Sequence, residues 1–244
     1  KFLASASSDY TARIWRTPDL QLVAVCGSHN DDVEMVSFHE KQPFIATSSR
    51  DHNVRVFRFD GSLQSLCKGH LSDVISVEWV SSKNLDLISS GDDGTIRVWD
   101  GSTGTQKKVI DLGNIETDTL VIAPYEIIYA GNDEGEIIVI NKNTRTCIKA
   151  HQAGIKRIVL SKNARWCVSI SYDRTVKLWE VDSNGKLSLQ DESVLPAQVW
   201  PRSASFLGDQ QVVFGTFGTT YATYNFETKK WDTSKIQNTR GLNA

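Results

Sequence analysis

The distribution of hydrophobic and polar residues along the chain predicts short β-strands joined by tight turns. In residues 85–100, LDLISSGDDGTIRVWD, two runs rich in Ile, Leu and Val flank the polar stretch Gly91-Asp92-Asp93-Gly94. Such apolar runs favour strands, and glycine readily adopts the positive φ that a tight hairpin turn requires. The stretch therefore predicts two antiparallel strands connected by this turn.

The same residue types recur at fixed offsets over most of the sequence. Four times an Asp lies six residues before an aromatic residue, and a Ser or Thr lies four residues before that Asp. In three of these units a His stands 28 or 29 residues before the aromatic residue. The aromatic residues, spaced by 42, 42 and 80 positions, are Trp15, Phe57, Trp99 and Trp179. A period near 40 residues is typical of a repeat protein built from small sheets.

With Lys68-Gly69-His70 at the entrance of one unit and Trp99-Asp100 at its exit, the sequence resembles the WD40 family. The resemblance implies an all-β fold, a β-propeller of four-stranded antiparallel blades. We expect about six blades over residues 1–236, followed by a polar tail at residues 237–244. The first unit offers only three strands, near residues 2–7, 11–16 and 21–25, and lacks the innermost one. Because a propeller must pair its edge strands, we expect upstream residues to supply that strand, giving seven blades in the intact protein, or else six.

Composition narrows the classes of partner. The 244 residues carry a net charge of −2, which argues against direct binding to nucleic acid or to an anionic membrane. No apolar run reaches the length of about 18 residues that a membrane span needs. The pattern of residues 2–5 already resembles a strand and no initiating Met precedes it, which suggests a fragment or a processed chain. We therefore leave open a targeting segment or a further domain upstream.

The four cysteines point to a reducing compartment, because no Cys-x-x-Cys pair or Cys/His metal spacing occurs. We therefore expect an intracellular protein, in the cytoplasm or nucleus, with no metal site and no cofactor. Three cysteines fall at the same point of their units, near the end of the fourth strand, and are predicted to be small buried residues. They are Cys26, Cys67 and Cys147.

The recurring Ser, His and Asp invite comparison with a nucleophilic catalytic site. Catalysis needs one activated Ser, whereas several degenerate copies indicate architecture. In the WD40 family these residues and the Trp form one hydrogen-bond chain inside a blade, so the resemblance implies a structural role here. The two complete sets are His70, Ser89, Asp93 and Trp99, and His151, Ser169, Asp173 and Trp179. We predict no catalytic residue.

One departure from the pattern and one further recurrence bear on this interpretation. In the second unit Phe57 replaces the indole donor, so His29, Thr47 and Asp51 are expected to form a shortened chain. A basic residue also stands two positions before each aromatic residue. These four side chains, which we expect to have solvated charged ends, are Arg13, Arg55, Arg97 and Lys177.

Residues that differ between units are the candidates for function. In WD40 propellers the loops before the first strand and the turns after the second crowd one rim, where partner peptides dock. The matching positions before the first strand include Asp32, Glu34, Asp73, Lys156, Trp200 and Arg202. Those around the turn include Arg50, His52, Asp92, Tyr172, Arg174 and Phe217. In the early units the residues before the first strand are acidic, and in the late units they are basic and aromatic. We therefore hypothesise a partner carrying both charge signs.

The sequence thus predicts a non-catalytic scaffold that binds a partner peptide or protein, as part of a larger complex. Two alternatives remain: a sensor or regulatory domain of a larger enzyme or signalling protein, and a subunit of an RNA-associated assembly. The segment at residues 195–201, with two prolines and Trp200, is either a plug or a contact patch.

Overall fold

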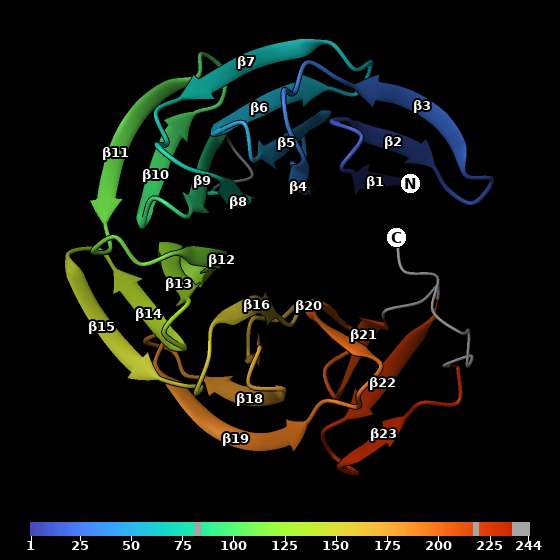
Figure 1. Cartoon of the computed structure of the whole chain (residues 1–244), viewed down its shortest axis with the longest axis vertical. Helices are drawn as coiled ribbons and strands as arrows, with labels where there is room; N and C mark the ends of the chain where they lie inside the picture. The colour runs from blue at the N-terminus through green and yellow to red at the C-terminus, as the bar shows by residue number, and fades with distance from the viewer. Residues whose placement is uncertain (81–83, 217–219, 236–244) are drawn as a thin grey trace. The chain divides into compact units, whose positions relative to one another are not determined.

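The chain folds into six antiparallel sheets, the first of three strands and the other five of four. The computed structural model describes residues 1–80, 84–216 and 220–235, so Phe217 and the predicted tail at residues 237–244 lie outside the described residues. One short 3-10 helix, η1 (Pro124–Glu126), interrupts the strands in this part of the chain. The predicted all-β fold of six blades, with three strands in the first, is confirmed (Figure 1).

Two compact units divide the chain, Lys1–Ile122 and Ala123–Ala244, and the division falls at the end of strand β12. Unit 1 contains blades 1 to 3 and nearly all of β12. Its strands are β1 (Phe2–Ala6), β2 (Ala12–Arg16), β3 (Gln21–Cys26), β4 (Val33–Phe38), β5 (Phe44–Ser49), β6 (Asn53–Arg58), β7 (Leu63–Lys68), β8 (Val74–Trp79), β9 (Asp86–Gly91), β10 (Thr95–Asp100), β11 (Thr105–Asp111) and β12 (Thr117–Ala123). The strand bounds predicted for the first blade agree with these to within one residue.

Unit 2 contains the rest of blade 4 and blades 5 and 6. Its strands are β13 (Ile127–Asn132), β14 (Glu136–Asn141), β15 (Thr144–Lys149), β16 (Ile155–Leu160), β17 (Trp166–Ser171), β18 (Thr175–Val181), β19 (Leu187–Val194), β20 (Val199–Phe206), β21 (Gln211–Thr216), β22 (Tyr221–Asn225) and β23 (Lys230–Asp232). In the complete blades the strands pair in chain order, each antiparallel to the next.

The hydrophobic cores lie between neighbouring blades of the same unit. In unit 1, Ile14 and Cys26 of blade 1 pack with Ile45 and Phe57 of blade 2, all 0% or 1% exposed. In unit 2, the residues of blades 5 and 6 likewise form one buried cluster. Blade 2 is covered on both faces, by blades 1 and 3, so its middle strands are buried without strict alternation. This packing fixes the orientation of the turns at the blade ends.

A register shift accompanies the repeated aromatic residue. Between the third and fourth strands the pairing slips just before Trp15, Phe57, Trp99 and Trp179. In blade 4, where Ile140 occupies the aromatic position, β14 and β15 pair residue for residue. The extra residue in blades 1, 2, 3 and 5 is the mark of a β-bulge, which strengthens the local twist.

The missing bulge explains why one prediction about the cysteines is wrong. Cys26 and Cys67 are buried as expected, but Cys147 is exposed. Cys67 pairs with Val54, three residues before Phe57, whereas the residue paired with the equivalent Ile137 is Ile148. Cys147 is therefore one residue out of phase, and a shift of one position moves a side chain to the other face of a strand.

Candidate functional site

The polar residues of blade 3 form one continuous hydrogen-bond chain. The indole Nε1–H of Trp99 donates to Ser89 Oγ at 2.9 Å, and Ser89 Oγ lies 2.7 Å from His70 Nε2. His70 Nδ1 lies 2.9 Å from Asp93 Oδ2. Since the indole can only donate and the carboxylate only accepts, the proton order that satisfies every group runs from Trp99 to Asp93, with His70 protonated on Nδ1.

Burial and hydrogen bonding set the charge states in this chain. Burial lowers the pKa of His70 below its usual value, although Asp93 opposes the shift. Burial alone would raise the pKa of Asp93, but hydrogen bonds from His70 and from the backbone N–H of Leu71 hold that pKa well below its usual range. At neutral pH a neutral imidazole therefore lies beside a carboxylate, and Ser89 is completely buried beneath them.

Blade 5 repeats this arrangement. Trp179 Nε1–H donates to Ser169 Oγ at 2.9 Å, Ser169 Oγ lies 2.8 Å from His151 Nε2, and His151 Nδ1 lies 3.1 Å from Asp173 Oδ2. Burial again lowers the pKa of His151. The hydroxyls of Ser89 and Ser169 are both 0% exposed and occupied on both sides, so they join strands of a blade rather than face solvent.

Blade 2 contains an unexpected member. Arg55 Nη1 lies 2.9 Å from His29 Nδ1 and 2.7 Å from Asp51 Oδ2, while His29 and Asp51 are 3.8 Å apart. Because a guanidinium only donates, His29 Nδ1 is the acceptor and Nε2–H points to Thr47 Oγ1 at 3.0 Å. Arg55 thus replaces the direct His–Asp contact of the other blades. Its side chain is 5% exposed, so the expectation of a solvated charged end is wrong there.

The blade ends beside these chains carry the predicted partner-binding residues. We call this end, formed by the turn after the second strand and the start of the first strand, the turn edge. Its two parts are joined by a repeated backbone bond: Arg50 N–H donates to Asp32 O, Asp92 N–H to Asp73 O, and Tyr172 N–H to Gly154 O, at 2.9 to 3.0 Å. The turn is therefore a fixed platform for the side chains it presents.

On the turn edge of unit 1 the candidate side chains form an ionic cluster. Arg50 Nε lies 2.5 Å from Glu34 Oε1 and 3.9 Å from Asp73 Oδ2, and His52 Nε2 lies 3.7 Å from Asp73 Oδ1. The Arg50 and His52 side chains are 43% and 50% exposed. With Asp32 and Asp92 at the same edge, acidic groups outnumber basic ones.

On the turn edge of unit 2 the cluster centres on an exposed aromatic ring. Tyr172 is 41% exposed, and its hydroxyl accepts a hydrogen bond of 2.9 Å from Arg202 Nε. Lys156 Nζ lies 4.7 Å from the centre of the Tyr172 ring, and the same amine pairs with Asp133. Trp200 is 37% exposed. Arg202 and two accessible aromatic rings therefore characterise this edge. The Lys156 side chain is only 6% exposed and is paired with Asp133, so its predicted place on an accessible rim is wrong.

Arg174 differs from the other candidates because its guanidinium is already engaged. It donates to the carbonyl oxygens of Val199 at 2.9 Å, Pro196 at 2.6 Å and Leu195 at 3.3 Å. These bonds hold the connection between blades 5 and 6 against the turn of blade 5. Arg174 therefore fixes the segment that presents Trp200.

Several turn residues adopt a backbone conformation that favours glycine. Gly94 and Gly135 have φ near 66° and 77° at the position after the repeated acidic residue. Tyr10, His52 and Arg174 occupy the same position with φ of 67°, 65° and 68°. A residue with a Cβ is disfavoured there by about 1–2 kcal/mol. Backbone strain of this kind tends to occur at functional sites, which draws attention to these side chains.

The repeated chain and turn agree with a comparison against protein families. The family described as "WD domain, G-beta repeat" matches residues 20–58, 61–100 and 141–180. The chain belongs to the WD40-repeat family. The matched segments include Asp51, Asp93 and Asp173 with the aromatic residues that follow them.

Curated relatives are between 25% and 29% identical to this chain over the aligned residues. The "Ribosome biogenesis protein WDR12 homolog" of Trichoplax adhaerens is 26% identical over 75% of this chain and 51% of its own length. The "Target of rapamycin complex subunit wat1" of Schizosaccharomyces pombe is 25% identical over 75% of this chain and 62% of its own. The "COMPASS component SWD3" of Saccharomyces cerevisiae is 29% identical over 56% and 47%. The chain thus spans less than two thirds of these relatives.

For this WD40 chain, the sequence missed two polar features of the blades. Arg55 could have been suspected from Phe57, because loss of the indole leaves the polar chain open to another donor. Asp133, the partner of Lys156, occupies the turn position of Asp92 and Tyr172 but was not among the predicted residues. Over the described ranges, no group of His, Cys, Asp and Glu has the arrangement of a metal site, and no helix is long and apolar enough to cross a membrane.

Proposed function

We propose that this WD40 chain is a non-catalytic scaffold that binds a partner protein or peptide through its turn edges. The observation that carries the proposal is the pair of clusters described above: accessible charged and aromatic side chains on rigid turns, next to fully buried polar chains. Aromatic and arginine side chains dominate the energy of many protein interfaces. The repeated Ser, His and Asp supply rigidity, and the variable turn residues supply recognition.

The charge of each cluster indicates the partner chemistry that suits it. The turn edge of unit 1, with Asp32, Glu34, Asp73 and Asp92, favours basic side chains. The turn edge of unit 2, with Arg202 and the Tyr172 ring, favours acidic or aromatic side chains. Cationic and anionic contacts of this kind contribute chiefly to specificity and association rate.

The names of the relatives support membership in a larger assembly. One is a subunit of the target of rapamycin complex, and another is a COMPASS component. The four cysteines are free thiols, which fits the expected reducing setting of the cytoplasm or nucleus. A regulatory domain of a larger protein would use the same surfaces.

Affinity purification with quantitative mass spectrometry tests the proposal. We expect the tagged wild-type chain to retain partners that are lost from the double variant Tyr172→Ala, Arg202→Glu. Lys108→Glu on β11 is the matched control, because it makes the same charge reversal on an exposed strand residue away from the turn edge. Equal recovery of every partner by the double variant Tyr172→Ala, Arg202→Glu and by the control would refute binding at the turn edge of unit 2.

A second candidate function is a role in an RNA-associated assembly, favoured by the ribosome biogenesis relative. With a net charge of −2, such a role would come through protein contacts. Sedimentation of the tagged chain with large RNA-containing particles, before and after ribonuclease treatment, tests it. Migration as a free protein under both conditions would exclude this role.

A further inference from the structure

Two cavities open at the edge of unit 2 that lies opposite its turn edge. They adjoin the turn between β16 and β17, and both are lined by Asn163 and Arg165. Because strands of a blade are antiparallel, this turn lies at the other end of the sheet from Tyr172. The first cavity, of about 280 Å³, is bounded by η1 and by the turn after β18. The second, of about 420 Å³, lies between blades 5 and 6.

The second cavity combines apolar walls with one largely buried carboxylate. Trp166, Leu178 and Phe226 supply apolar surface, and the Asp191 side chain, 9% exposed, lines the same cavity. Asp191 Oδ2 accepts a hydrogen bond of 2.9 Å from the hydroxyl of Tyr224. This bond fixes the carboxylate from the protein side and leaves Oδ1 for a cation.

That cation is at present a surface lysine. Lys229 Nζ lies 3.0 Å from Asp191 Oδ1, and the Lys229 side chain is 66% exposed. An ion pair made by so exposed a lysine contributes little, because the amine remains well hydrated and the long side chain loses entropy. An incoming guanidinium, less strongly hydrated and able to donate two hydrogen bonds, can displace it.

Charge in the cavity also favours a cation. Of the other lining groups, Asp209 and Glu227 are acidic. The basic lining groups are Arg165 and Lys229, so with Asp191 the three acidic groups outnumber them. The Arg165 guanidinium also lies 3.2 Å from Glu180 and 5.1 Å from the centre of the Trp166 ring. We propose that this cavity binds an arginine side chain of a partner protein, with the guanidinium on Asp191 and the methylene groups against Leu178 and Phe226.

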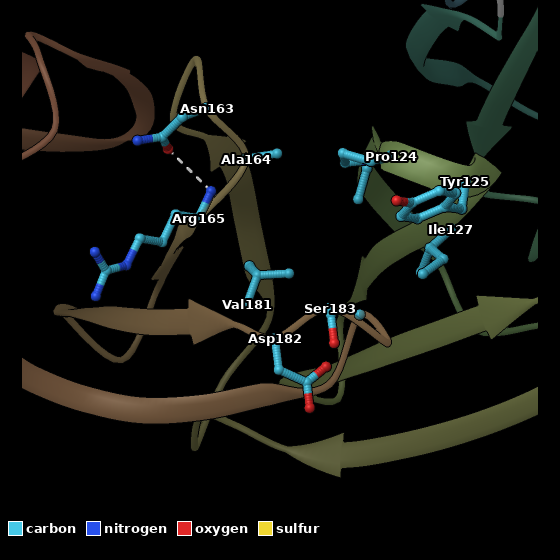
Figure 2. A pocket seen from close by; sticks show the side chains of 11 residues that line it. Pro124, Tyr125, Ile127, Asn163, Ala164, Arg165, Val181, Asp182 and Ser183 are labelled. Atoms are coloured by element: carbon cyan, nitrogen blue, oxygen red, sulfur yellow. Dashed lines mark hydrogen bonds between the residues drawn. The ribbon is translucent and has the colours of Figure 1, made fainter.

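The first cavity extends the same surface. Tyr125, 80% exposed, stands beside it with Pro124 and Ile127, as Figure 2 shows. Tyr125 and Glu126 both have positive φ, 64° and 59°, a conformation that costs about 1–2 kcal/mol at each non-glycine residue. A partner segment crossing the Asn163–Arg165 turn would place its arginine in one cavity and an apolar side chain against Tyr125. This site is independent of the turn-edge proposal.

A short peptide with a neutral isostere tests the site. The probe is acetyl-Gly-Arg-Gly-amide, and its control replaces arginine by citrulline, which has the same shape without the charge. The full chain is titrated with each, and the indole N–H signal of Trp166 is followed by NMR. We expect a saturable shift with the arginine probe. No saturable shift up to about 10 mM, or equal binding of the citrulline peptide, would overturn the proposal.

Two variants with opposite expected effects locate the binding. Asp191→Asn weakens arginine binding about tenfold or more, because the charge partner is lost. Lys229→Ala tightens it at least about twofold by removing the competing amine, and this exposed residue is not needed for folding. Glu192→Gln makes the same charge change on the next residue and serves as the control. Because Glu192 pairs with Lys177 and not with Lys229, this variant leaves arginine binding unchanged. Unaltered affinity in both Asp191→Asn and Lys229→Ala would refute the assignment.

Discussion

Two adjacent serines of β9 offer a sharp test of the buried hydrogen-bond chain. Ser89 and Ser90 are both 0% exposed. Ser89 Oγ accepts from the Trp99 indole and donates to His70, whereas Ser90 Oγ has no hydrogen-bond partner among the residues that the structure describes. The perturbation is the same in both cases, replacement of one hydroxyl by hydrogen in Ser89→Ala and in Ser90→Ala.

The expected magnitudes differ because of what each hydroxyl leaves behind. Ser89→Ala leaves the indole N–H of Trp99 and Nε2 of His70 without a hydrogen-bond partner. Each unsatisfied buried polar group costs about 1–3 kcal/mol. We therefore expect Ser89→Ala to lower the free energy of unfolding by about 2–4 kcal/mol. Ser90→Ala removes a buried hydroxyl that gains nothing from a partner, so we expect no destabilisation. Blade 5 has Ile170 in the place of Ser90, which shows that an apolar side chain fits this position.

Urea denaturation followed by circular dichroism measures both variants, with the slope of the transition compared to confirm that the unfolded states are alike. Equal losses of stability in the two variants would refute the reasoning. So would a larger loss in Ser90→Ala than in Ser89→Ala, since the hydrogen-bond chain would then carry no special weight.

Three further predictions follow from the same structure. Burial first, and then Arg55, lower the pKa of His29 to about 4. From the ordinary value of 6.5 this is about 3 kcal/mol, and because the unfolded state binds the proton first, stability falls as pH drops from 6.5 to 4. Urea titrations across that range should show a smaller fall in His29→Gln. His52→Gly removes the backbone strain of a non-glycine residue in the left-handed conformation. Thermal unfolding should therefore show equal or higher stability, by up to about 1 kcal/mol, while the recovery of partners in affinity purification falls. A thiol reagent should modify Cys147 in the native chain and reach the buried cysteines only after unfolding, namely Cys26, Cys67 and Cys167.

Each of these has a distinct contrary result. An unchanged pH dependence in His29→Gln would show that His29 titrates normally in the fold. A clear loss of stability in His52→Gly would mean that the His52 side chain holds the turn. Modification of more than one thiol in the native chain, with Cys147→Ser as the control, would contradict the burial of the others.

The repeat pattern located the strands because each blade is a local structure. Hairpin turns, apolar runs and the recurrent Asp are all read from residues close in sequence, and the observed strand bounds of the first blade fall within one residue of those predicted. The resemblance to the WD40 family implied the members of both hydrogen-bond chains, and the recurring offsets gave their positions in this sequence. The distances that join those members came from the structure.

Other features of the blades depended on side-chain contacts that the spacing of residues along the sequence does not reveal. A single bulge decided that Cys147 is exposed while Cys67 is buried, because one extra residue reverses the face of a strand. Arg55 lies between His29 and Asp51 in a blade where Phe57 removes the indole donor. As a result His29 carries its proton on Nε2, whereas His70 carries it on Nδ1. The cavity at Asp191 is formed by turns of two blades brought together by packing.

The sequence by itself therefore determined the repeat and the strands, because these follow from short-range periodicity, and its resemblance to the WD40 family implied the buried polar residues. Only the tertiary structure decided which charges are paired, which turn residues are strained and which acidic side chain is enclosed between blades. Those properties depend on side chains distant in sequence that meet across a blade or between blades, where burial strengthens every electrostatic interaction.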